Sequence, residues 1–60
     1  MARIPMIEEL AVVNGWTIER HNRGSASTFK AIKYDAEGYQ TAGSDEFTYK
    51  RDAIAFAERT

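Results

Sequence analysis

Apolar residues recur at helical spacing near the start of the chain. They are Met6, Ile7, Leu10 and Val13. Pro5 suits a first helical turn, where an N–H group has no partner within the helix. The Asn-Gly pair at 14–15 suits a helix end, because glycine readily adopts the left-handed conformation of a C-terminal cap. The pattern predicts a helix over Ile4–Asn14, with Glu9 on the flank of its apolar stripe.

The spacing changes to an alternation after residue 15. Trp16 and Ile18 alternate with polar residues, which predicts a strand over Trp16–His21. Glycine and short polar side chains predict a loop over residues 22–27. A second strand is predicted over Thr28–Tyr34, where apolar residues occupy both alternating positions. Either a bulge shifts this pattern or both faces of the strand carry apolar surface.

Two turns, a short strand and a helix complete the chain. Residues 35–38 and 43–46 are predicted turns on either side of a third strand at Tyr39–Ala42. A second apolar stripe predicts a helix over Tyr49–Arg59 with Thr48 as its N-cap. That stripe consists of Tyr49, Ala53, Phe56 and Ala57.

The predicted element order is α-β-β-β-α. It indicates an α+β fold in which two helices pack on one face of a three-stranded antiparallel sheet. At 60 residues, the chain is expected to form a single domain, residues 1–60.

Length and composition limit the possible functions. The chain has no cysteine, which excludes a disulfide framework and a thiolate metal site. No apolar run approaches the ~20 residues that span a bilayer, and the first residues lack the apolar block of a signal peptide. We therefore expect a cytoplasmic protein with no membrane segment, cofactor or small-molecule substrate, since so short a chain has little room for a pocket.

The charged residues are segregated, although the formal net charge is only −1. Residues 16–34 hold four basic residues against one glutamate, whereas residues 35–46 hold four acidic residues and no basic one. Lys50 and Arg51 then open the last predicted helix, where the helix dipole disfavours positive charge. A basic pair at such a position indicates a role in binding an anion.

The predicted elements carry a recognisable order of residues: a glutamate-bearing first helix, aromatic residues at the strand starts, and a basic start of the last helix. The first predicted helix contains Ile-Glu-Glu-Leu at 7–10, Trp16 opens the first strand, and Phe29 lies near the start of the second. A turn with Gly43 precedes a helix that begins Tyr-Lys-Arg-Asp-Ala at 49–53. In order and spacing, these features resemble the double-stranded RNA-binding domain over nearly the whole chain.

The resemblance implies a non-catalytic domain that binds double-stranded RNA by shape. The first helix would enter one minor groove, where its glutamate accepts a hydrogen bond from a 2′-hydroxyl, and the loop after the first strand would reach the next minor groove. The basic pair of the last helix would contact phosphates between them. The implied RNA-binding residues are Glu9, His21, Asn22, Arg23, Lys50 and Arg51.

Two other binding functions stay open. The acidic segment 35–46 favours a small protein-interaction or inhibitor module, of the kind that phages encode, with a basic partner. Alternatively, Arg20, Lys30 and Lys33 would contact DNA from the sheet, as in the arm-type DNA-binding domain of tyrosine recombinases, whose β-β-β-α order is similar. An enzyme is not expected, because His21 is the only histidine and has no second metal ligand spaced near it. A triad of Ser25, His21 and Asp35 has no nucleophile-elbow motif to support it.

Overall fold

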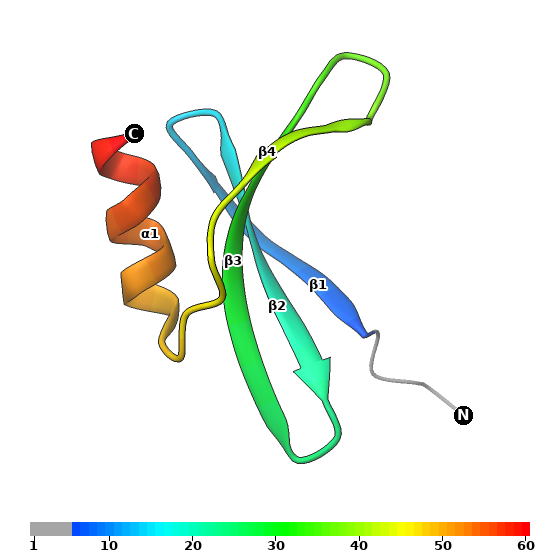
Figure 1. Ribbon diagram of the computed structural model, residues 1–60, viewed down its shortest axis with the longest axis vertical. Coiled ribbons are helices and arrows are strands. Elements are labelled where there is room, and N and C mark those ends of the chain that lie inside the picture. Colours follow the sequence, from blue (N-terminus) through cyan, green and yellow to red (C-terminus); the bar gives the residue numbers. More distant parts are fainter. Residues whose placement is uncertain (1–5) are drawn as a thin grey trace.

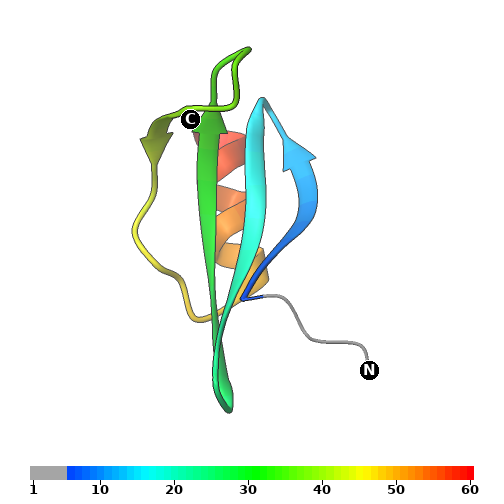
Figure 2. The ribbon, with the colours of Figure 1, turned by 90° about the vertical axis from the view of Figure 1, so that its right-hand side faces the viewer.

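The computed structural model describes residues 6–60, which form a four-stranded antiparallel sheet and one helix. The elements are β1 (Ile7–Val13), β2 (Trp16–Arg23), β3 (Ala26–Tyr34), β4 (Gln40–Gly43) and α1 (Lys50–Arg59). The strands lie side by side in chain order, and α1 packs against one face of the sheet (Figures 1 and 2). The predicted α+β class is confirmed. The prediction of three strands and two helices is wrong, since the described chain has four strands and one helix.

The segment predicted as the first helix is the edge strand β1, which pairs antiparallel with β2. A bulge explains why its sequence imitates a helix. Glu9 lies opposite Glu19 and Ala11 lies opposite Ile18, so Leu10 is an extra residue in β1. This insertion puts Leu10 and Val13 on the same face, where both pack against the core. The predicted helix start at residues 4–5 lies outside the described residues.

Two tight hairpins set the register of the first three strands. Asn14 and Gly15 form the β1–β2 turn with φ of 52° and 81°, and two positive values identify a type I′ turn. Gly24 and Ser25 form the β2–β3 turn, and only the glycine has a positive φ, of 64°, as in type II′. The predicted helix cap at 14–15 is therefore a hairpin turn. The loop predicted over residues 22–27 is shorter in the structure. β2 continues to Arg23 and β3 begins at Ala26, so only Gly24 and Ser25 form the turn.

The later part of the chain follows the prediction more closely. The third predicted strand, Tyr39–Ala42, is β4, shifted by one residue. Apolar residues do occupy both faces of β3, because Ala31 is buried under α1 and Ile32 is buried on the opposite face. The register shift beside β3 has its extra residue, Thr41, in β4, and β3 pairs with β2 without a bulge. Apolar surface on both faces therefore explains the imperfect alternation, and the alternative of a bulge in this strand is wrong.

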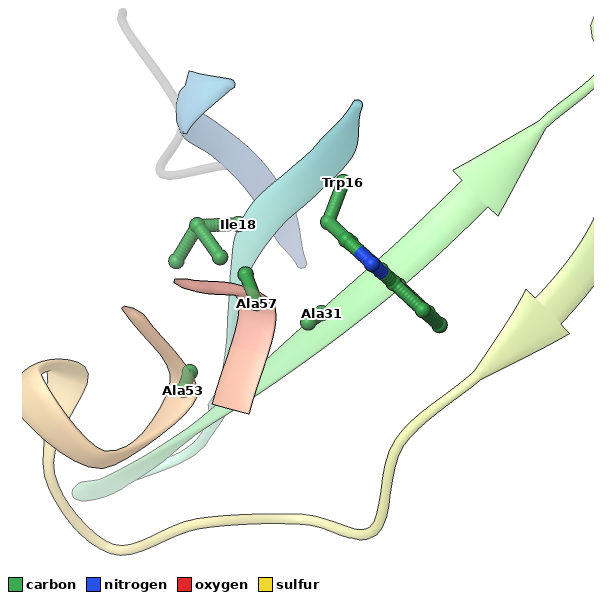
Figure 3. Packing of buried hydrophobic residues seen from close by; sticks show 5 residues of the cluster. All are labelled: Trp16, Ile18, Ala31, Ala53 and Ala57. Carbon is green, nitrogen blue, oxygen red and sulfur yellow. The ribbon is translucent and has the colours of Figure 1, made fainter. Parts of the chain in front are cut away.

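The core lies between α1 and the sheet. Its buried members are Trp16, Ile18, Ala31, Ala53 and Ala57 (Figure 3). The two helical alanines are fully buried, and their small side chains allow α1 to approach the strands closely. Larger, partly buried side chains, including Phe47 and Phe56, pack against these buried residues. Phe56 packs edge-to-face on Trp16 with ring centroids 5.2 Å apart.

The start of α1 differs from the prediction in two respects. Tyr49, not Thr48, is the N-cap residue, and no side chain caps the helix there. Tyr49 is 55% exposed, so it does not belong to the apolar stripe. The other end of α1 is tied to the β1–β2 turn, where the Asn14 Nδ2 donates a hydrogen bond of 3.1 Å to the Ala57 carbonyl. Within residues 6–60, no helix is long and apolar enough to cross a membrane.

Candidate interaction surfaces

The six predicted RNA-binding residues lie on three different parts of the molecule. Glu9 is on the edge strand β1, not on a helix, so the predicted minor-groove contact from a first helix is wrong. His21, Asn22 and Arg23 form the last part of β2, not a loop. Lys50 and Arg51 open α1 as expected, and both are exposed.

His21 belongs to a hydrogen-bonded group on the face of the sheet opposite α1, which we call the open face. Its Nε2 lies 3.2 Å from Oε1 of Glu19, a buried residue with 7% exposure. The other carboxylate oxygen of Glu19 accepts a hydrogen bond from the Tyr34 hydroxyl. This bond, together with partial burial and the nearby carboxylates, raises the pKa of Tyr34 to about 12. The group satisfies the buried carboxylate and leaves His21 only partly exposed.

Asn22 and Arg20 are held by Glu8. Asn22 Nδ2 donates to Glu8 at 2.9 Å, and an Arg20 guanidinium nitrogen donates to the same carboxylate at 2.7 Å. These two bonds hold the pKa of Glu8 below its usual value, the Asn22 bond having the larger effect. Asn22 also accepts a hydrogen bond from the Ser27 hydroxyl across the hairpin. Both side chains are therefore committed to contacts within the fold.

Arg23 is neutralised by the acidic segment. Its guanidinium lies 3.0 Å from the carboxylate of Glu46, which also accepts a hydrogen bond from the Thr28 hydroxyl. The Thr28 bond is the main cause that lowers the pKa of Glu46. Asp35, at the other end of the segment, accepts hydrogen bonds from the N–H groups of Glu37 and Tyr39. Two of the four acidic residues thus have partners within the chain.

The basic pair at the start of α1 has no acidic partner among residues 6–60. Neither Lys50 nor Arg51 forms an ion pair with any described residue. The Arg51 guanidinium lies over the Tyr49 ring, 4.6 Å from its centroid. This end of α1 points toward the same end of the molecule as the β2–β3 hairpin (Figure 1). Among the predicted RNA-binding residues, these two remain available to an anion.

The three strand cations proposed for DNA binding do not share a face. Lys30 lies opposite Glu19 in the register and is on the open face. Arg20 lies opposite Phe29 on the α1 side, and Lys33 is also on that side, with its Nζ 5.0 Å from the centre of the Trp16 ring. A single groove of DNA therefore cannot contact all three from one face of the sheet.

The free edge of β1 is a surface that the sequence reading missed. Two of its apolar side chains are strongly exposed, Ile7 at 53% and Val12 at 64%. No described element pairs with its outer side (Figure 2). The Asn-Gly pair at 14–15 was the available signal, because this dipeptide between apolar segments is the strongest short-range indication of a hairpin.

A shallow hollow lies beside the first residues of β1. It has a volume of about 320 Å³ and is lined by Met6, Ile7, His21, Asn22 and Arg23. Met6 is 77% exposed, so apolar surface continues from the strand edge into this hollow. The hollow is open, which suits one side chain of a docked segment better than an enclosed small molecule.

Within residues 6–60, no group of three or more histidine, aspartate or glutamate side chains is placed to hold a metal ion. No protein-family model matches the chain, and neither a curated protein nor a solved structure matches it.

Proposed function

We propose that this chain is a non-catalytic protein-interaction module that binds an extended segment of its partner along the free edge of β1. The observation that carries the proposal is the combination of free backbone groups and exposed apolar side chains on this strand. An edge strand offers a row of N–H and C=O groups to which another chain can add a strand.

The register shows which backbone groups of β1 face outward. Asn22 N–H donates to the Met6 carbonyl at 2.7 Å, so these two residues form a hydrogen-bonded pair. Hydrogen-bonded and non-hydrogen-bonded pairs alternate along an antiparallel ladder. Ile7 and Glu9 therefore direct their backbone groups away from β2. Beyond the bulge, the two-residue turn at 14–15 pairs Val13 with Trp16, and Val12 faces outward for the same reason.

The outward-facing residues also carry their side chains on the open face. Ile7, Glu9 and Val12 are opposite His21, Glu19 and Thr17, which all lie on that face. A strand added to β1 would pair with the backbone of these three residues and cover the two exposed apolar side chains. Natural sheets commonly protect such edges with lysine or proline, and β1 has neither. The protective features of this strand are its bulge at Leu10 and the charges of Glu8 and Glu9.

The experiment is an amide NMR titration of the labelled protein with short extended peptides. The first probe is the acetylated and amidated peptide Thr-Val-Thr-Ser-Thr-Val-Thr, whose palindromic sequence presents the same side chains in either strand direction. We expect shifts along β1 and slower hydrogen exchange at the N–H groups of Ile7, Glu9 and Val12. A matched peptide with proline in place of the serine and the two threonines beside it should not bind, because it lacks the central N–H groups that pair with β1 in either strand direction.

The proposal can be separated from general hydrophobic binding. The chain is short enough for chemical synthesis, so an N-methyl group can be placed on the outward N–H of Glu9. This change should abolish peptide binding while leaving the β1–β2 hydrogen bonds intact. Peptide shifts spread over the whole protein, or unchanged binding by the N-methylated chain, would contradict strand addition.

A second candidate, nucleic-acid binding, is favoured by Lys50 and Arg51, which form no ion pair within the described part of the chain and lie at a helix start that no side chain caps. Duplex RNA would place its phosphates against this end, and the polar tip of the β2–β3 hairpin would approach the minor groove. Duplex RNA, duplex DNA and single-stranded RNA of one sequence would be titrated at low salt. Shifts confined to Lys50, Arg51 and residues 22–27, lost in K50Q/R51Q but kept in the control R59Q, would support this function. Absence of shifts with all three would exclude it.

A further inference from the structure

Glu9 occupies the outer end of a row of charged residues across the open face. The register aligns Glu9, Glu19 and Lys30 on β1, β2 and β3. Both oxygens of Glu19 are used by His21 and Tyr34. Glu9 is exposed, and none of the described residues forms an ion pair or hydrogen bond with its carboxylate. The row therefore ends at the free edge in a negative charge that no residue of 6–60 compensates.

The like charges are also close together. Glu9 and Glu19 form a non-hydrogen-bonded pair, in which Cα atoms approach to about 4.5 Å and side chains are closest. Like charges directly opposite each other destabilise an antiparallel pair. A cation placed on the outer side of Glu9 would offset this repulsion, and the next position in the row belongs to an added strand.

We propose that the segment bound at β1 carries a lysine or arginine opposite Glu9, with apolar residues on the same face beside Ile7 and Val12. The inference rests on the proposed strand addition and assigns the chemistry of the partner. Glu9 then selects the partner by charge, while the two apolar residues provide buried surface. The hollow next to Ile7 receives the partner's apolar side chain at that end.

A second copy of this chain fits the edge less well. β1 carries two glutamates and no basic residue. Antiparallel pairing of two copies with Ile7 opposite the other copy's Val12 would bring both Glu9 side chains to the centre of the contact, beside two copies of Glu19. The charge pattern thus disfavours self-association and favours a basic partner.

The test uses three peptides that differ only in the central residue: Thr-Val-Thr-X-Thr-Val-Thr with lysine, serine or glutamate at X. We expect the lysine peptide to bind about 3- to 10-fold more tightly than the serine peptide, and the glutamate peptide more weakly than both. The variant E9Q should remove this preference and keep binding at β1. The control E37Q removes the same charge from an exposed turn and should keep the preference.

The outcomes distinguish the inference from the function on which it rests. If all three peptides bind β1 with equal affinity, or if E9Q retains the lysine preference, charge selection by Glu9 is wrong while strand addition stands. If none of the three shifts β1, both fail. Concentration-dependent β1 shifts without any peptide would identify a second copy as the occupant and would also overturn the inference.

Discussion

Glu9 and Glu19 lie directly opposite each other on β1 and β2. Among the described residues, His21 is the only basic side chain within ion-pair distance of either carboxylate, that of Glu19. We expect this arrangement to reduce the stability of the free protein, because like charges directly opposite each other destabilise an antiparallel pair. Under the proposed strand addition, Glu9 would favour binding of the partner at the expense of the stability of the free protein.

The first prediction concerns this repulsion. Replacing Glu9 by glutamine should increase the free energy of unfolding by about 0.2–1 kcal/mol, since it removes the like charge opposite Glu19. Urea denaturation at low salt measures the change, which should diminish as added salt screens the charges. The control E37Q should change stability by less. A loss of stability in E9Q would show that Glu9 has a favourable partner.

The second prediction concerns Asn14, which has two roles in the β1–β2 turn. Its φ of 52° is unfavourable for most side chains, and its Nδ2 hydrogen-bonds the Ala57 carbonyl. N14A should lose both contributions and destabilise the fold by about 1.5–3 kcal/mol, whereas N14G should lose only the hydrogen bond, about 0.5–1.5 kcal/mol. Denaturation of the two variants separates the roles. Equal losses would mean that the backbone conformation contributes nothing.

The third prediction concerns the space between α1 and the sheet. Ala53 is fully buried, so a leucine there has to displace α1 or its neighbours. A53L should lower the free energy of unfolding by about 1–3 kcal/mol, as overpacked cores do. The control A55L places the same side chain on a partly exposed position of α1 and should cost less. Thermal denaturation compares them, and an unchanged midpoint for A53L would contradict this close packing.

The fourth prediction concerns alkaline pH. The pKa of Tyr34 is about 12 in the folded protein, above its ordinary value of 10.0, because its hydroxyl donates to the Glu19 carboxylate. The folded state thus binds this proton more tightly than the unfolded state. The resulting stabilisation is complete below pH 10 and is lost as the pH rises toward 12.

Comparison with Y34F isolates that contribution, since the two proteins differ only in this hydroxyl. Urea midpoints measured from pH 8 to 12 should fall more steeply for the natural chain than for Y34F, and the difference between them should narrow above pH 10. Parallel curves would show that the Tyr34–Glu19 bond does not contribute.

The sequence by itself determined the elements whose signals are local. The alternation from Trp16 to His21 and the apolar stripe with Ala53 and Ala57 identified β2 and α1 because side-chain periodicity depends only on the conformation of that segment. The pattern misled at residues 7–13, where the bulge at Leu10 places Leu10 and Val13 on one face at a helix-like spacing, although Ile7 lies on the other face. The neighbouring strand, not the segment itself, allows that bulge.

Only the tertiary structure decided which side of β1 stays unpaired and which charges meet. Arg23 reaches Glu46 and Arg20 reaches Glu8 because the register brings distant residues together. The same register places Glu9 beside Glu19. The position of α1 leaves Lys50 and Arg51 without a carboxylate partner among the residues that the structure describes. The sequence does not determine which charged side chains lie near one another, because strand pairing brings distant residues together. The candidate binding surfaces depend on these neighbours, so only the tertiary structure identifies them.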